Sequence, residues 1–149
     1  MAAKTTDQAI DIYLDIDGVL LANDAQPAPY ALEFIEYVLT NYPETTYWLT
    51  THCNGDASKP IKNIGYLFDE ATVEFMKQIK PTAWDLAKTR AIDLSRPFLW
   101  FDDDLFYEER EVLLQHNLLD NWIEVDLQRD PKQLAKFLES FPMPVNFNQ

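Results

Sequence analysis

The stretch DIYLDIDGVLLAND (residues 11–24) is the most informative part of this sequence. It begins in the apolar segment IDIYLD (residues 10–15) and reaches two aspartates spaced two positions apart, Asp15 and Asp17, followed by Gly18. A segment with so little polar interruption is typical of a strand that is covered on both faces. Residues i and i+2 of an extended chain point to the same side, so both carboxylates can face one ligand. Gly18 allows the chain to turn sharply behind them.

Strand and helix patterns alternate along the rest of the chain. The patterns predict helices over residues 30–42, 69–79, 82–94, 107–119 and 130–141, a weaker helix over 61–68, and strands over 45–51, 98–101 and 121–126. Asp69 is the expected N-cap of one helix, and Asp130 and Pro131 are the expected start of the last one. We interpret Glu108, Glu109 and Glu111 as a solvated helix face.

This alternation predicts an α/β fold with a mainly parallel sheet covered on both faces. We expect a single doubly wound, Rossmann-like domain over residues 1–149, with its core over about 8–140 and an irregular tail over 141–149. The intervals between the predicted elements are too short for a large cap domain. A chain of 149 residues that is 47% hydrophobic can bury a core without disulfides or structural metals.

Composition and charge narrow the classes of protein and of partner. A single cysteine, Cys53, and a start without a signal-peptide pattern predict a cytoplasmic protein. A net charge of −13 argues against extended nucleic-acid binding. No apolar run approaches the roughly 18 residues that a membrane span needs, so we expect no membrane association. We expect a monomer or a weak dimer.

Polar side chains follow three of the predicted strands at the point where each ends. They are Asp15 and Asp17, Thr50 and Thr51, and the run Asp102, Asp103 and Asp104. Ligands of open α/β sheets bind beyond the carboxyl ends of the strands, so these side chains are expected to meet. Two like charges about 4 Å apart repel by roughly 4 kcal/mol at an effective dielectric constant of 20. Such a cluster must hold protons or bind a cation, and oxygen ligands favour Mg²⁺ where phosphate completes the shell.

Several of these motifs resemble, in the same order, those of the haloacid dehalogenase-like superfamily. YLDIDGVLL resembles the first signature, YWLTT the second and FLWFDDD the fourth, and AWDLAKTRAIDL supplies the lysine that precedes the fourth. The resemblance covers about residues 10–104. Within the superfamily, the pairing of WLTTH with LWFDDD is similar to small capless members, including phosphatase-like domains of some RNA-repair proteins.

This resemblance implies a Mg²⁺-dependent phosphohydrolase that acts on a phosphomonoester. Asp15 would be the nucleophile that carries a transient aspartyl-phosphate, and Asp17 the proton carrier. Lys88 would offset the negative charge. The ion would be held by the Asp15 carboxylate, the Asp17 backbone carbonyl and an acid of the 102–103 pair, with Asp103 as the expected direct ligand and Asp102 as its support. The residues expected to bind substrate are Gly18, Thr50, Thr51 and His52.

Alternatives remain at this stage. Lys80 competes with Lys88 for the lysine role, because it also precedes the fourth motif. A non-catalytic module that binds phosphate or metal is a second function, and a phospho-accepting receiver domain is a third, which the order of the motifs disfavours. The substrate is expected to be a phosphorylated small molecule or a phosphorylated nucleic-acid end.

Overall fold

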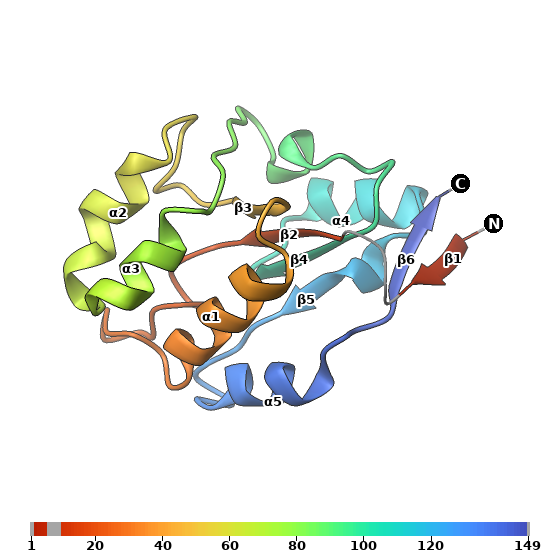
Figure 1. Cartoon of the computed structure of the whole chain (residues 1–149). Coiled ribbons are helices and arrows are strands. Elements are labelled where there is room, and N and C mark those ends of the chain that lie inside the picture. The colour runs from red at the N-terminus through yellow and green to blue at the C-terminus, as the bar shows by residue number, and fades with distance from the viewer. Residues whose placement is uncertain (1, 6–9, 149) are drawn as a thin grey trace.

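The computed structural model of the protein describes residues 2–5 and 10–148 and has an α/β architecture (Figure 1). The strands of this part of the chain are β1 (Ala2–Thr5), β2 (Asp11–Leu14), β3 (Thr46–Trp48), β4 (Phe98–Asp102), β5 (Trp122–Glu124) and β6 (Val145–Asn148). Its α-helices are α1 (Ala31–Asn41), α2 (Ser58–Ile64), α3 (Glu70–Met76), α4 (Tyr107–Gln115) and α5 (Gln133–Ser140). Short 3₁₀ helices are η1 (Gly65–Leu67), η2 (Lys88–Ala91) and η3 (Leu119–Asn121).

Four parallel strands form the central sheet of the described residues, in the order β3-β2-β4-β5. The chain steps outward from β2 to β3 and then crosses back past β2 to reach β4. The carboxyl ends of β2 and β4 therefore flank the point where the strand order reverses, which is where open α/β sheets bind ligands. The predicted α/β class with a mainly parallel sheet is confirmed, and the topology is consistent with a Rossmann-like fold.

Side chains of β4 alternate between two apolar layers, one on each face of the sheet. Leu99 and Phe101 join the larger core together with residues of α1 and α5. Phe98 and Trp100 join a smaller core with Leu113 of α4. In Figure 1, α1 and α5 accordingly lie on one side of the sheet and α4 on the other. Burial of both faces explains why the strand sequences are almost continuously apolar.

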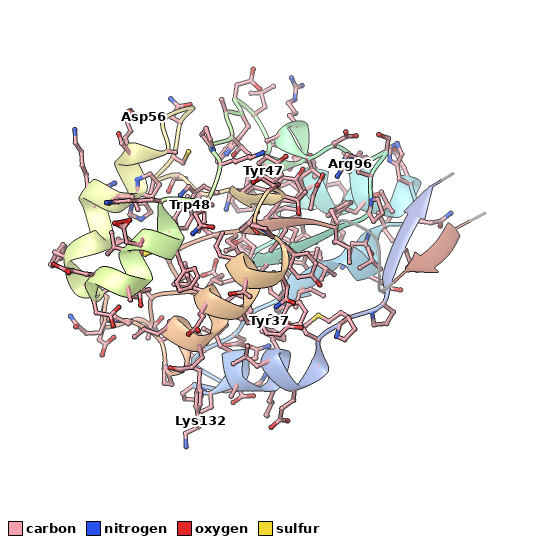
Figure 2. All side chains as sticks on the ribbon, in the orientation of Figure 1. Tyr37, Tyr47, Trp48, Asp56, Arg96 and Lys132 are labelled. Carbon is pink, nitrogen blue, oxygen red and sulfur yellow. The ribbon has the colours of Figure 1, made fainter. Side chains whose placement is uncertain are left out.

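The two ends of the sheet carry different elements. Figure 1 shows α2 and α3 at the end toward which β2 and β3 point, and the two chain termini at the other. Side chains also differ in whether they point into the domain or away from it. Figure 2 shows Trp48, which is fully buried, directed into the interior, whereas the exposed Asp56 and Lys132 extend from the surface.

The irregular tail predicted over residues 141–149 is wrong for Val145–Asn148, because this segment is β6 and pairs antiparallel with β1. Its backbone is also anchored from within the domain. The side-chain Nδ2 of buried Asn121 donates to the Asn146 carbonyl at 2.5 Å, and the backbone N–H of Asn146 donates to Asn121 Oδ1 at 3.0 Å. A short strand that pairs with the opposite end of the chain leaves no local sequence pattern, since its partner lies more than a hundred residues away.

Two of the helix predictions also need correction. The helix predicted over residues 82–94 is only the 3₁₀ turn η2, because Asp85 and Asp93 accept hydrogen bonds from nearby backbone N–H groups and stabilise turns instead. The last helix begins at Gln133 rather than at Asp130, whose carboxylate pairs with Lys136 Nζ at 2.6 Å.

Other predicted elements are confirmed, with shifted bounds. Asp69 caps α3 by accepting the Thr72 N–H at 2.8 Å. The strand predicted over residues 45–51 is shorter, since β3 covers only Thr46–Trp48. The weak helix predicted over 61–68 is α2 followed by η1.

Candidate functional site

Three aspartates meet where β2 and β4 end. Asp15 directly follows β2, Asp102 is the last residue of β4, and Asp103 comes next. One carboxylate oxygen from each lies within 4.8 Å of the other two. Asp15 and Asp102 are buried, with 8% and 1% of their surface exposed, whereas Asp103 is exposed. The predicted meeting of acids that are distant in the chain is therefore what the geometry shows.

Lys88 lies between two of these acids. Its Nζ atom is 2.7 Å from Asp102 Oδ2 and 3.3 Å from Asp15 Oδ2, and its side chain is only 14% exposed. Burial by itself lowers the pKa of Lys88, but the carboxylates of Asp15 and Asp102 outweigh that effect and raise it. Lys80 instead pairs on the surface with Glu44 at 3.7 Å. Of the two candidate lysines, Lys88 is the one that reaches the acids.

Glu109 fixes the backbone that carries Lys88, a role that the sequence did not reveal. Its Oε2 atom accepts the Lys88 N–H at 2.8 Å, and its Oε1 atom accepts the Phe106 N–H at 3.0 Å. Only 3% of Glu109 is exposed, so its assignment to a solvated helix face is wrong. Glu109 lies in the first turn of α4, three residues after the N-cap Phe106. A Glu at this position commonly caps the helix backbone, and this spacing is the feature of the sequence that could have predicted its role.

Asp102 uses both of its oxygens within the protein. Oδ2 accepts from Lys88 Nζ and from Trp100 Nε1 at 3.1 Å, and Oδ1 accepts from the Asp104 N–H at 3.3 Å. Burial, reinforced by the charge of Asp15, outweighs the ion pair with Lys88 and raises the pKa of Asp102 to about 8. Burial is also the main reason that the pKa of Asp103 is raised. Lys88 alone therefore does not offset the cost of ionising these buried acids, and a further cation would favour their ionised forms.

Gly18 makes room for the Asp103 side chain. Its φ of +82° lies in the left-handed region, and a Cβ atom at this position would overlap the Asp103 carboxylate, only 2.6 Å from its Cγ. A glycine is therefore required for two reasons, conformation and space. An open pocket of about 260 Å³, lined in part by Gly18, Asp103 and Glu124, adjoins the acids on this side. A larger pocket of about 860 Å³ lies between α2 and α3 and contains none of the three acids.

The remaining predicted site residues lie on two turns beside the acids. The Asp17 side chain is 68% exposed and its Oδ2 atom is 2.8 Å from His52 Nε2. Its carboxylate is not one of the three that converge. Thr50 is fully buried and its hydroxyl accepts the His52 N–H at 3.3 Å, whereas Thr51 is exposed. The roles predicted for Asp17, Thr50, Thr51 and His52 remain predictions.

Chemically, the cluster of Asp15, Asp102 and Asp103 could hold a metal ion. Three carboxylates offer hard oxygen ligands, and the raised pKa values of Asp102 and Asp103 mean that their ionised forms would gain from a nearby cation.

Within the residues that the structure describes, no helix is both long and apolar enough to span a bilayer. Comparison with known proteins finds no matching family model, no matching curated protein and no matching solved structure.

Proposed function

We propose that this protein is a Mg²⁺-dependent phosphohydrolase that cleaves a phosphomonoester through an aspartyl-phosphate intermediate. One observation carries the proposal: Asp15, Asp102 and Asp103 cluster at the reversal of strand order, with Lys88 Nζ between the first two. Phosphoryl transfer requires alignment and neutralisation of charge more than elaborate covalent chemistry. A lysine and a cation among carboxylates supply both, and the resemblance to haloacid dehalogenase-like sequences points to the same chemistry.

The donor set fits Mg²⁺. This ion prefers hard oxygen ligands, which carboxylates and backbone carbonyls supply. One carboxylate oxygen of each of the three acids lies within 4.8 Å of the other two, so acids from both strand ends could share one ion. Asp102 already accepts three hydrogen bonds, which favours Asp103 as the direct ligand and Asp102 as its support. The backbone carbonyl of Asp17 is the expected further ligand. When bound, the ion would polarise the phosphoryl group and offset its charge.

The reaction would proceed in two displacements. A carboxylate oxygen of Asp15 attacks phosphorus, the ester P–O bond breaks, and the leaving oxygen takes a proton from the Asp17 carboxyl group. A water molecule then attacks the aspartyl-phosphate and gives a proton to the Asp17 carboxylate. The bond between phosphorus and Asp15 breaks, which releases inorganic phosphate and restores both aspartates.

Two side chains would assist this chemistry without changing covalently. Lys88, 3.3 Å from Asp15 Oδ2, offsets the charge of the nucleophile and of the incoming phosphate. Thr50 is expected to donate its hydroxyl to the phosphoryl group.

The substrate class follows from openness and charge. We expect no large cap over the acids, and Asp17 and Asp103 are exposed, so that a bulky phosphomonoester could reach them. A phosphorylated small molecule or a phosphorylated nucleic-acid end fits such a site. Long nucleic acids are disfavoured by the net charge of −13. We also propose that the protein is cytoplasmic and is a monomer or a weak dimer.

The test is release of phosphate from p-nitrophenyl phosphate and from a panel of phosphomonoesters, with Mg²⁺ and with excess EDTA. Turnover that needs Mg²⁺ and a labelled phosphoryl group on Asp15 support the proposal. Uniform inactivity despite Mg²⁺ binding would indicate the non-catalytic module. Slow labelling by acetyl phosphate without hydrolysis of esters would indicate the receiver-like domain.

A further inference from the structure

Three side chains from three segments form a hydrogen-bonded chain beside the acids. His52 lies in the turn after β3, and its Nε2 atom is 2.8 Å from Asp17 Oδ2. Its Nδ1 atom is 3.1 Å from the side-chain Nδ2 of Asn63, in the last turn of α2. The His52 side chain is 22% exposed and the Asp17 side chain 68%. The chain therefore runs from α2, through a largely buried imidazole, to an exposed carboxylate.

An exposed carboxylate has several accessible rotamers, but a proton carrier must face the leaving oxygen. Staggered χ1 wells differ little in energy when a side chain projects into solvent, so Asp17 without a partner would be distributed among them. A bond from a largely buried imidazole selects one rotamer. It also occupies Oδ2, which leaves Oδ1 as the oxygen that can deliver and receive the proton.

Asn63 determines which imidazole nitrogen carries hydrogen. An amide nitrogen only donates, so His52 Nδ1 must accept from Asn63 Nδ2. In the neutral ring the hydrogen then resides on Nε2, which donates to the Asp17 carboxylate. The same logic of a third group that orients a histidine operates in other catalytic sites.

We propose that His52, held by Asn63, is a positioning residue that orients Asp17 for proton transfer to the leaving group. This inference rests on the proposed function and adds to it, since it gives His52 a role toward Asp17 rather than toward the substrate. It also assigns a function to α2. Within the described residues, Asn63 of this helix makes no hydrogen bond to the three clustered acids.

A kinetic test uses the dependence of proton transfer on the leaving group. A nitrophenolate leaves without much help, whereas an alkoxide needs the proton. We expect His52→Ala to lower kcat about 30-fold on an alkyl phosphate and less than about 3-fold on p-nitrophenyl phosphate, with KM nearly unchanged. His52→Gln keeps a donor nitrogen and should recover most of the loss. Asn63→Ala should show the same pattern at about a third of the size.

Two variants make this test decisive. In the Asp17→Asn background, His52→Ala should add no further loss, because the two residues act as one unit. His116→Ala changes the other histidine, an exposed residue at the end of α4, and should leave both substrates unaffected. Equal losses of His52→Ala on both substrates, or full additivity with Asp17→Asn, would overturn the inference.

A second measurement does not require turnover. Long-range ¹H–¹⁵N spectra of the imidazoles, assigned with His116→Ala, should show His52 in the tautomer with hydrogen on Nε2. Asn63→Ala should shift this signal toward the average of exchanging tautomers, because the Asp17 carboxylate alone would then favour hydrogen on Nε2. A wild-type His52 that already averages, or that carries hydrogen on Nδ1, would refute the positioning role even if the protein is an active phosphatase. Lack of any phosphatase activity, by contrast, would refute the proposed function.

Discussion

Strand β2 has a buried aspartate at each end, and the two are compensated in different ways. Asp11, at its start, pairs with Arg96 through two hydrogen bonds of 2.9 and 3.1 Å, one to each carboxylate oxygen. Asp15, after its end, shares the single cation Lys88 with Asp102 and lies beside Asp103. At the first end, the arginine forms its ion pair with one carboxylate. At the second end, one lysine pairs with two carboxylates and a third lies within 4.8 Å of them, which leaves capacity for a bound cation.

The pairing of each carboxylate, rather than its burial, distinguishes the structural acid from the proposed functional one. Both aspartates are more than nine-tenths buried, so burial alone does not separate them. Bidentate pairing with an arginine satisfies the carboxylate geometry fully. In the cluster, burial together with the charge of Asp15 raises the pKa values of Asp102 and Asp103, so their carboxylates gain free energy from a metal ion or a proton.

The largest expected effect separates the two aspartates directly. Asp15→Asn should lower kcat on the order of 10³-fold or more, because the amide cannot serve as the nucleophile. Asp11→Asn should leave kcat within about twofold and lower the free energy of unfolding by about 1 kcal/mol, since Arg96 is half exposed. Phosphate release and urea denaturation measure the two quantities. A comparable loss of kcat in both variants would abolish the distinction.

The next effect concerns the two cations. Lys88→Met should lower kcat about 10²-fold and destabilise the metal-free protein by about 3 kcal/mol, because two buried carboxylates lose their counter-charge. Mg²⁺ should restore much of that stability. Arg96→Met, as the matched change, should cost about 1 kcal/mol, and Mg²⁺ should not restore it. Thermal unfolding with and without Mg²⁺ provides the readout, and equal rescue of both variants would contradict the interpretation.

The third effect is the dependence of stability on pH. Asp102 has a folded-state pKa of about 8 against an ordinary value of 3.8, so between these values the folded protein binds more protons than the unfolded one. Stability of the metal-free protein should therefore fall as the pH rises from about 4 to about 8, by at most about 1.4 kcal/mol per pH unit.

Matched variants identify the source of this slope. Asp102→Asn should remove most of it, and Asp11→Asn should leave it in place. Because Mg²⁺ competes with protons for the same oxygens, the increase in melting temperature that it produces should grow over the same pH range. A slope that survives in Asp102→Asn would exclude this residue as its origin.

The smallest expected effect comes from two glycines with the same backbone conformation. Gly18 and Gly55 have φ values of +82° and +78°. Alanine at either position should cost about 1–2 kcal/mol of stability, because an L side chain strains the left-handed region. Only at Gly18 would the new methyl group displace Asp103, whereas at Gly55 it meets Ala83 at an ordinary 3.7 Å. Calorimetry should then show Mg²⁺ affinity reduced about 10-fold in Gly18→Ala and unchanged in Gly55→Ala.

Features that depend on neighbouring residues could be predicted from the sequence. Apolar periodicity located β2, β4 and α1 to within a residue or two, because both faces of these strands and one face of this helix are buried. The sequence also predicted that Asp15 and Asp103 would meet, since parallel strands end at the same edge of a sheet. This part of the site follows from topology alone.

Features that depend on distant contacts could not be predicted. The segment over residues 82–94 has helical periodicity, yet only η2 forms, and Lys88 at its start pairs with Asp102 of β4. Glu109 differs from its solvated neighbour Glu108 only by its capping position in the first turn of α4, and its bond to the Lys88 N–H of η2 forms only in the folded protein.

Adjacent residues are enough to predict the α/β class, the acids at the strand ends and the glycine behind the first of them, because these features depend on local periodicity and chemistry. The folded arrangement establishes which lysine reaches the acids, that His52 lies between Asn63 and Asp17, and that β1 and β6 join the chain ends. Each of these is a contact between residues far apart in the chain, and its formation depends on how whole elements pack rather than on any local pattern.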